Sequence, residues 1–238
     1  MSVKPLQSAE RVLIVLEHLA EYQPIGVAAL ARLLDEDKSA VQRALVTLAA
    51  AGWIRPTGDE ITRWELTTRA LVVASNAQQR LDLARMARAT LEALQQQTGE
   101  TTLLAVPDAG RIVVVDVVES REMVRTAPHV GMVIPTDESA AGQAILAAMA
   151  DDDRNTFLGA IPIKAVRAEL TTARERGWSL NVRQPGATSV GAAIRDATGR
   201  PLGAIAISAI AERLPRRRHA HYGAMVARAA EALSARSA

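Results

Sequence analysis

The chain begins with two short segments whose apolar residues recur at helical spacing. Segment 8–21 (SAERVLIVLEHLAE) opens with Ser8, whose hydroxyl can cap a helix. Segment 27–37 (VAALARLLDED) places Leu30, Leu33 and Leu34 on one face. We therefore expect two helices, the second of which turns these three leucines inward.

A third segment, 37–54 (DKSAVQRALVTLAAAGWI), separates apolar from polar residues. Val41, Leu45 and Leu48 stand at i, i+4 and i+7, and Gly52 is placed to end the helix. Residues 53–66 then predict two short strands around the turn TGDE. Three helices followed by a hairpin are the pattern of a winged helix-turn-helix, in which the third helix enters the major groove of DNA.

The polar face of the third helix supplies groups that suit DNA. The Gln42 amide can pair with adenine, and the Arg43 guanidinium suits guanine or a phosphate. Residues at the helix start are better placed for backbone phosphates. We expect DNA to be contacted by Lys38, Ser39, Gln42, Arg43 and Thr47 on the helix, and by Arg55 and Arg63 beside the hairpin turn. The alternative is that these residues are only the solvated face of a small helical bundle.

Net charge does not by itself indicate a DNA-binding protein. The formal charge of the chain is +2, and residues 1–80 hold nine Lys or Arg against nine Asp or Glu. A positive DNA-binding surface must therefore come from the arrangement of basic residues and not from their excess.

The rest of the chain predicts an α+β domain. A helical pattern runs on to about residue 97, with a possible interruption at Ser75–Asn76, and its apolar residues must be buried against another surface: Leu81, Leu83, Met86, Leu91 and Leu94. After TGET the period changes to two. Strand pairs are predicted in 102–120 and 188–209, further strands in MVRT (123–126) and VGMVIP (130–135), and helices at 139–149, 165–177 and 219–237.

The order and spacing of several segments match a known family. The matching segments are SAERVLIVLEHLAE, LARLLDEDKSAVQRALVTLAAAGWI, TGET, VVVDVVES, VGMVIPTDESAAGQAILA, RERGWSL and GAAIRDATGRPLGAIAIS. With them the chain resembles the isocitrate lyase regulator (IclR) family of bacterial transcription factors over essentially its full length. The resemblance implies a winged helix-turn-helix over 1–68, a linker helix over 69–98 and a GAF-like effector-binding domain with an antiparallel sheet over 99–238. It also implies dimers or dimers of dimers, in contact through the DNA-binding domains and linker helices, which would bury the leucine-rich face of residues 81–94.

The resemblance further implies a ligand pocket around helix 139–149 and the last strand pair. The first N–H groups of that helix lack intrahelical partners, and this favours an anion there. The effector-binding residues implied are Ser139, Ala140 and Ala141 at the helix start, Ser189 where many members carry Cys, Ser208, and the wall residues Met123, Thr126 and Ile134. Alternatively, backbone groups satisfy the two strand hydroxyls of Ser189 and Ser208.

Some positions depart from the family pattern. Asp137 stands where members often have His, and Gln143 where they often have Lys. The loop NVRQPGATS (181–189) holds Arg183 where acidic residues are usual. An arginine beside the pocket would pair with a carboxylate, so we expect an acidic effector.

Enzymatic readings find no support in the motifs. The absence of cysteine excludes disulfides, thiolate catalysis and Cys-based metal sites. The chain has no Gly-x-Ser-x-Gly elbow, phosphate loop, His-Glu-x-x-His or dinucleotide fingerprint, so we expect no enzyme and no cofactor. Asp151–Asp153 cannot all face one way, and His219 and His221 have no third ligand nearby, so no metal site is expected. The run Arg216–Arg218 is expected in a surface turn.

The sequence thus predicts a cytoplasmic, ligand-responsive repressor. No apolar run reaches the roughly 20 residues needed to span a bilayer, and the N-terminus lacks a signal peptide, so no membrane partner is expected. The expected partners are double-stranded operator DNA, a small carboxylate and further copies of the chain in a homodimer or homotetramer. A sensory module acting only by protein contact, or a small-molecule hydrolase, are the alternatives. An aromatic acid and a short keto acid are both allowed, as are induction and co-repression, and the target operon stays open.

Overall fold

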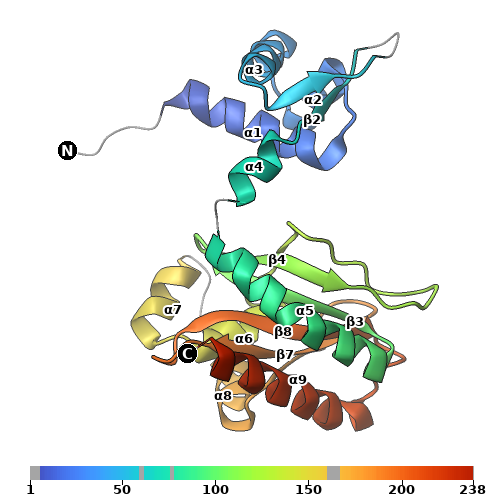
Figure 1. Cartoon of the computed structure of the whole chain (residues 1–238), viewed down its shortest axis with the longest axis vertical. Helices are drawn as coiled ribbons and strands as arrows, with labels where there is room; N and C mark the ends of the chain where they lie inside the picture. Colours follow the sequence, from blue (N-terminus) through green and yellow to red (C-terminus); the bar gives the residue numbers. More distant parts are fainter. Residues whose placement is uncertain (1–5, 59–61, 76–77, 160–166, 238) are drawn as a thin grey trace. The chain divides into compact units, whose positions relative to one another are not determined.

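The computed structural model describes residues 6–58, 62–75, 78–159 and 167–237 (Figure 1). It divides into two compact units, Met1–Ala77 and Gln78–Ala238. The helical pattern over 69–98 contributes to both, because α4 (Arg69–Ser75) belongs to the first unit and α5 (Gln78–Thr98) to the second. Asn76, the second residue of the expected interruption, lies with residue 77 outside the described residues. The domain limits given above stay a prediction.

The first unit contains the three helices and the hairpin expected of a winged helix-turn-helix. α1 (Gln7–Tyr22), α2 (Val27–Leu34) and α3 (Lys38–Ala50) pack around a core whose fully buried members include Val15, Leu19, Leu30, Val41 and Leu45. Strands β1 (Ile54–Pro56) and β2 (Trp64–Leu66) pair antiparallel. The turn residues 59–61 lie outside the described residues.

Helix α3 ends where the sequence predicts because Gly52 adopts a φ of +77°. The N–H groups of Gly52 and Trp53 donate to the carbonyls of Ala49 and Leu48, each at 2.9 Å. Glycine adopts this left-handed conformation without a steric penalty, which is why it commonly ends helices in this way. The chain can therefore turn directly from α3 into β1.

Two details of the first unit differ from the prediction. Ser8 lies inside α1 and does not cap it, since the helix begins at Gln7 and Leu6 precedes it without a side-chain cap. Leu33 does not face inward, because Ala31 takes the buried place beside Leu30 on α2. Leu33 is 49% exposed as a result.

The second unit is built on an antiparallel sheet that, among the described residues, has six strands in the order β5-β4-β3-β8-β7-β6. The strands are β3 (Thr101–Asp108), β4 (Arg111–Val118), β5 (Val133–Ile134), β6 (Ser179–Asn181), β7 (Ala187–Arg195) and β8 (Pro201–Ile210). β3–β4 and β7–β8 are the two predicted hairpins, and β3 pairs with β8 to join them. The predicted α+β class with an antiparallel sheet is confirmed.

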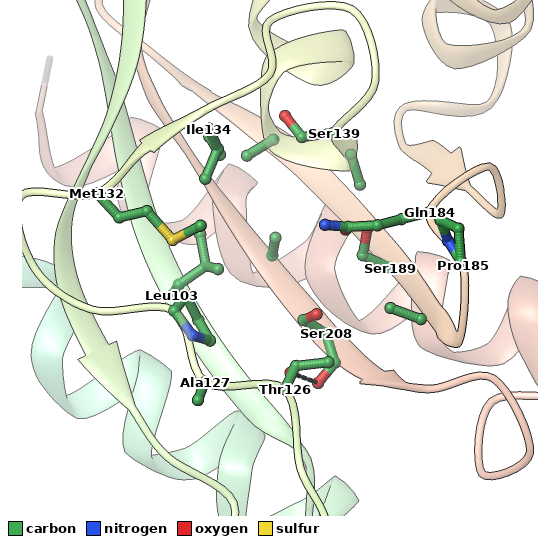
Figure 2. A pocket seen from close by; sticks show the side chains of 15 residues that line it. Leu103, Thr126, Ala127, Met132, Ile134, Ser139, Gln184, Pro185, Ser189 and Ser208 are labelled. Carbon is green, nitrogen blue, oxygen red and sulfur yellow. Dashed lines mark hydrogen bonds between the residues drawn. The ribbon is translucent and has the colours of Figure 1, made fainter. Parts of the chain in front are cut away.

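One face of this sheet carries small side chains and meets α6 (Ala140–Ala148). Ala204 and Ala206 of β8 and Ala105 of β3 pack there against Ala144 and Ile145 of the helix. α7 (Asp151–Leu158) and α8 (Arg167–Arg176) pack on the far side of α6. Small side chains let α6 approach the sheet, and this face also carries the pocket drawn in Figure 2.

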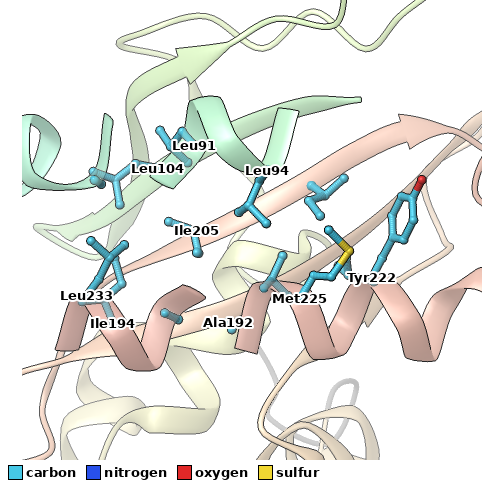
Figure 3. Packing of buried hydrophobic residues seen from close by; sticks show 14 of the residues in the cluster. Leu91, Leu94, Leu104, Ala192, Ile194, Ile205, Tyr222, Met225 and Leu233 are labelled. Carbon is cyan, nitrogen blue, oxygen red and sulfur yellow. The ribbon is translucent and has the colours of Figure 1, made fainter. Parts of the chain in front are cut away.

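The opposite face carries larger side chains and is covered by α5 and α9 (Arg216–Arg236) (Figure 3). Leu83, Leu91 and Leu94 of α5 belong to the same buried cluster as Leu104 of β3 and Ile205 of β8. We expected a partner subunit to bury this leucine-rich face. That expectation is wrong, because the chain's own sheet buries it. The side chain of Leu81 lies outside the described residues.

Other corrections concern the irregular segments of the second unit. MVRT (123–126) is not a strand, because the Thr126 carbonyl is held by the Thr101 hydroxyl at 3.0 Å and forms no ladder. VGMVIP contributes only the short strand β5, and the prediction did not include α7 or β6. The run Arg216–Arg218 forms the first turn of α9, which starts directly after Pro215, and is not a separate surface turn.

A buried ion pair joins the start of β3 to the segment after β8. Arg213 donates from Nε and Nη2 to the two carboxylate oxygens of Glu100, both at 2.7 Å, and from Nη1 to the carbonyl of Val124, also at 2.7 Å. Glu100 is buried, and its hydrogen bonds with Arg213 raise the pKa of the guanidinium. Through Arg213, the loop after β4 is therefore held close to Glu100, which lies just after α5.

Replacing Arg213 by methionine should destabilise the second unit by about 3–5 kcal/mol, because the Glu100 carboxylate would stay buried without its partner. Urea unfolding of the full chain, followed by hydrogen exchange in peptides from β3 and β8, measures this change. Arg125→Met is the matched control, since it breaks the exposed Arg125–Glu119 pair of the same loop and should cost about 0–1 kcal/mol. Equal losses for the two variants would contradict the assignment.

Candidate functional site

The outer face of α3 carries all the helix residues predicted to contact DNA. Lys38, Ser39, Gln42, Arg43 and Thr47 are exposed. Residues three and four apart share a helix face, so these side chains form one polar strip opposite the buried apolar stripe. Lys38 and Gln42 make no side-chain hydrogen bond with a described residue, so their polar ends are free for a ligand.

Asp37 organises the first turn of α3. Its Oδ1 accepts hydrogen bonds from the N–H of Ser39 at 2.8 Å, from the N–H of Ala40 at 3.2 Å and from the Ser39 hydroxyl. The Ser39 hydroxyl and then the two N–H groups lower the pKa of Asp37. Arg43 donates from Nη1 to the Ser39 hydroxyl oxygen at 3.2 Å. Ser39 and Arg43 are therefore already linked to each other and to the helix cap.

Val46 belongs to the same exposed strip, although sequence reasoning did not select it. It is 54% exposed and follows Arg43 by three residues and Gln42 by four. An apolar side chain in this place can contact the methyl group of thymine. The signal was its helical position, which puts it on the polar face despite its aliphatic character. Thr47 donates its hydroxyl to the Arg43 carbonyl at 2.8 Å.

The hairpin after α3 carries the two predicted wing residues. Arg55 lies opposite Glu65 in the β1–β2 ladder, and its Nε donates to Glu65 Oε1 at 2.7 Å. Part of the Arg55 guanidinium is therefore already paired. Arg63 is exposed, and its carbonyl accepts from the N–H of Thr57 at 2.8 Å, which places it next to the turn of the hairpin.

The second unit has a pocket of about 270 Å³ on the α6 face of its sheet (Figure 2). Leu103, Met132 and Ile134 form an apolar side. Gln184 and Ser189 lie on the other side of the pocket in Figure 2. A ligand with one apolar and one polar end matches this division.

Strand register brings two hydroxyl groups together in the pocket. Ser189 of β7 pairs directly with Ser208 of β8, and side chains of directly opposite residues project from the same face. The Thr126 hydroxyl donates to the Ser208 carbonyl at 3.1 Å. Among the described residues, the hydroxyls of Ser189 and Ser208 have no hydrogen-bond partner. The alternative in which backbone groups satisfy them is therefore wrong for the described part of the chain.

The start of α6 adds backbone donors to the pocket. Ser139 is the N-cap, and its Oγ accepts from the N–H of Gly142 at 3.0 Å, while its carbonyl accepts from the N–H of Gln143 at 2.9 Å. The N–H groups of Ala140 and Ala141 have no acceptor within the described residues, and both residues line the pocket. Such a helix end favours a negatively charged group.

Close contact between α6 and β7 fixes this helix end. A Cβ on Gly191 of β7 would lie 2.9 Å from the carbonyl carbon and oxygen of Ala140 and 3.1 Å from the nitrogen of Ala141. Only glycine therefore leaves room for the first turn of α6. The Ser179 hydroxyl donates to the Ala140 carbonyl at 2.5 Å and holds the same turn from β6.

The described residues lining the pocket include no ionisable side chain. An anion bound here would rest on the two backbone N–H groups, the helix dipole and neutral hydroxyl or amide donors. Seven of the nine predicted effector-binding residues line this pocket: Thr126, Ile134, Ser139, Ala140, Ala141, Ser189 and Ser208. Their role in binding an effector stays a prediction.

Two predicted effector-binding residues do not line the pocket. Met123 is 94% exposed and is absent from the pocket lining. The guanidinium of Arg183 binds the carboxylate of Glu169 on α8. The expected pairing of Arg183 with a ligand in this pocket is therefore wrong. Gln143, at one of the departing family positions, donates to the carbonyl of Asp137 at 2.9 Å.

Sequence reasoning missed Leu103, Met132 and Gln184 in the lining. The pleat of β3 determines which face of the sheet Leu103 lies on. No local sequence pattern shows which of the two faces meets α6. Gln184 directly follows Arg183 in the loop between β6 and β7. The sequence therefore indicated the right loop, but Gln184 and not Arg183 lines the pocket.

The remaining sequence features have local structural partners. Asp151 pairs with Arg154 at 2.8 Å, and a ring nitrogen of His219 bonds the Leu214 carbonyl at 3.0 Å. Over the described ranges, no group of three or more His, Cys, Asp or Glu side chains is arranged to hold a metal ion. No helix in those ranges has the length and apolarity that a membrane span requires.

Two family models together match most of the chain. The model for the IclR helix-turn-helix domain matches residues 8–58, and the model for the C-terminal domain of bacterial IclR transcriptional regulators matches residues 75–235. The chain belongs to the IclR family of bacterial transcriptional regulators. It is thus a ligand-responsive DNA-binding regulator and not an enzyme, in agreement with the prediction.

Individual relatives agree over nearly the whole chain. The transcriptional repressor IclR of Escherichia coli (strain K12) is 28% identical over 95% of this chain and 88% of its own length. The regulator KdgR of the same organism is 26% identical over 97% of this chain and 92% of its own length. A solved IclR homologue from Microbacterium hydrocarbonoxydans, complexed with 4-hydroxybenzoate, has a TM-score of 0.78 at 20% identity, with 96% of this chain and 98% of that chain covered.

The Asp37 cap of α3 should weaken in acid. The pKa of Asp37 is lowered in the folded chain, so its contribution is complete above the pKa of the unfolded chain, roughly 3.9, and is lost as the pH falls through the lower folded value. The amide shifts of Ser39 and Ala40 in NMR spectra report this titration. Their midpoint should lie below that of Asp37 in an unstructured peptide of residues 35–41, and equal midpoints would contradict the cap.

Proposed function

We propose that the chain represses transcription by binding operator DNA as a homodimer, with α3 and the hairpin as its DNA-binding surface. A small monocarboxylate in the α6 pocket then changes the affinity for DNA. The observation that carries the second part is one pocket that, within the described part of the chain, has a neutral lining and brings together two N–H groups and two hydroxyls without hydrogen-bond partners. The names of the curated relatives, several of them repressors, support the first part.

The DNA-binding role rests on the exposed strip of α3. Gln42 and Arg43 offer amide and guanidinium donors to base edges, and Val46 offers an apolar contact to thymine. Lys38 and Ser39 lie at the helix start, where side chains and N–H groups bind phosphates. Arg55 and Arg63 add basic groups on the hairpin. The first unit is not basic overall, so this local arrangement supplies the positive surface.

The ligand class follows from the size and charge of the pocket. A volume of about 270 Å³ lies at the lower limit for small-molecule sites, so a small ligand fits best. Backbone donors and hydroxyls can hold one carboxylate, but the described residues of the lining include no cation to compensate a second negative charge. The apolar side of Leu103, Met132 and Ile134 suits a hydrocarbon or aromatic body. The bound 4-hydroxybenzoate of the Microbacterium homologue belongs to this class of molecule.

The homodimer is supported by exposed apolar residues in the first unit. Leu71, Val72 and Val73 of α4 are all at least half exposed, and so is Leu13 of α1. Exposed apolar side chains that gather into one patch usually mark an interface, and we propose that these residues are covered by a second copy of the chain. Two recognition helices brought together in this way would bind half-sites spaced by about one turn of DNA.

The ligand would act by shifting the population of dimer arrangements. Thr126 lines the pocket, and Val124 lies two residues before it in the same loop. The Val124 carbonyl accepts a hydrogen bond from Arg213, which also pairs with Glu100 just after α5. A ligand that moves Thr126 could therefore also move the end of α5 through these contacts. A ligand that binds one arrangement more tightly favours that arrangement and changes the spacing of the recognition helices.

Replacing Arg43 by alanine should weaken operator binding by about 10- to 100-fold, which corresponds to a loss of about 1–3 kcal/mol for a good base contact. Fluorescence anisotropy with labelled DNA from upstream of the gene measures this at fixed salt. Arg111→Ala, which removes an exposed arginine of β4, is the control and should bind as the unaltered chain does. No binding by the unaltered chain even at low salt would favour regulation by protein contact only.

Replacing Ser208 by alanine should weaken carboxylate binding about 3- to 10-fold, because one hydrogen bond is worth about 0.5–1.5 kcal/mol. A thermal-shift screen of small carboxylates identifies a ligand, and calorimetry then compares the variants. Ser237→Ala, outside the pocket, is the control. Operator binding without ligand should not change, and its loss in Ser208→Ala would argue against separate DNA and effector sites.

A further inference from the structure

A second crevice of the effector domain lies between α7 and α8, outside the pocket described above. It has a volume of about 280 Å³ and is lined by Asp151, Arg154, Arg167, Leu170, Thr171 and Arg174. Three of these six residues are arginines, and only one is acidic. The crevice is thus a concave and strongly basic site that the proposed function does not use.

Helical spacing on both walls places these groups together. Arg167, Thr171 and Arg174 stand at i, i+4 and i+7 of α8 and share one face of that helix. Asp151 and Arg154 stand at i and i+3 of α7 and share the facing side. The N-terminal ends of both helices contribute to the crevice, and their dipoles add to its positive potential.

Arg154 is an unusual arginine because it is 7% exposed. Its Nη2 donates to Asp151 at 2.8 Å and its Nη1 to the Met149 carbonyl at 3.5 Å. Its Nε is fully buried and has no hydrogen-bond acceptor among the described residues. An unsatisfied donor on a buried cation is costly, so an acceptor at this place would stabilise the fold.

The other two arginines leave the positive charge uncompensated. Arg174 donates to the carbonyls of Ala147 and Met149 at the end of α6 and lies 3.4 Å from Asp151. Arg167 is exposed and makes no side-chain bond with a described residue. The crevice thus holds three guanidinium groups and one carboxylate, that of Asp151, which pairs with both Arg154 and Arg174. The lining therefore has an excess of two positive charges.

We propose that this crevice binds the phosphate group of a small phosphorylated molecule, or free phosphate. A phosphate carries about −1.5 to −2 charges near neutral pH, which matches the excess in the crevice. Its oxygens can accept from several guanidinium groups at once, beginning with the free fork of Arg167. The volume leaves space for an organic group beyond the phosphate.

This site would act on the same helix as the effector pocket, but at its other end. Arg174 holds the C-terminal carbonyls of α6, whereas the pocket described above lies at the N-terminus of that helix. A phosphate that draws Arg174 or Arg154 toward itself changes the bonds that hold the end of α6. The crevice therefore offers a second input to the effector domain, and its test does not depend on the carboxylate proposal.

Calorimetry of the full chain with inorganic phosphate, at an ionic strength matched with sodium chloride, tests the site. Arg167→Gln removes an exposed side chain and should leave the fold intact, yet it should weaken phosphate binding at least about tenfold. Arg111→Gln is the matched control and should bind phosphate as the unaltered chain does. In NMR spectra, the Nε–H signal of Arg154 should move on phosphate addition, which reports on the buried group without altering it.

Glycerol 3-phosphate distinguishes the two sources of the group. Tighter binding than inorganic phosphate supports a phosphorylated molecule, and equal binding supports free phosphate. The proposal is overturned if phosphate has no effect beyond that of sodium chloride, or if Arg167→Gln and Arg111→Gln bind phosphate equally. A signal of Arg154 that stays in place while phosphate binds would put the anion elsewhere and would also overturn it.

Discussion

The second unit depends on one steric constraint, the contact between the first turn of α6 and the backbone of β7. Gly191 leaves room for the peptide groups of Ala140 and Ala141, and the Ser179 hydroxyl holds the Ala140 carbonyl. Because of this contact, the N-terminal end of α6 lines the same pocket as the paired residues Ser189 and Ser208. The backbone N–H donors that a ligand would meet at this helix end are therefore fixed by packing before the ligand binds.

The two faces of the sheet differ in what they carry: one packs the larger buried core, and the other carries the pocket. Its α5–α9 face carries larger side chains, among them Leu104, Ile194 and Ile205, which pack with α5 and α9 in one buried cluster (Figure 3). Its α6 face has alanine in the corresponding places, and the room that remains becomes the pocket. Because few residues in the chain are aromatic, this difference comes mainly from the sizes of aliphatic side chains. The Glu100–Arg213 pair then links the pocket wall to the face that provides stability.

Local patterns predicted the parts that depend on local physics. The apolar stripe of α3, its end at Gly52 and the two long hairpins follow from spacing and turn chemistry. The positions of Arg183 and Met123 did not follow, because they depend on α8 and on a loop held by residues distant in sequence. For the same reason, the sequence showed that Leu91 and Leu94 needed a partner surface but not that β3 and β8 supply it.

The neutral lining of the pocket at α6 has a consequence for how acidity would affect the proposed ligand binding. None of the described residues around it exchanges a proton near physiological pH, so occupancy should neither take up nor release protons on the protein side. Acidity would then alter recognition only through the acid–base equilibrium of the metabolite itself. A regulator built in this way reports the concentration of one ionised form and needs no titrating residue of its own to do so.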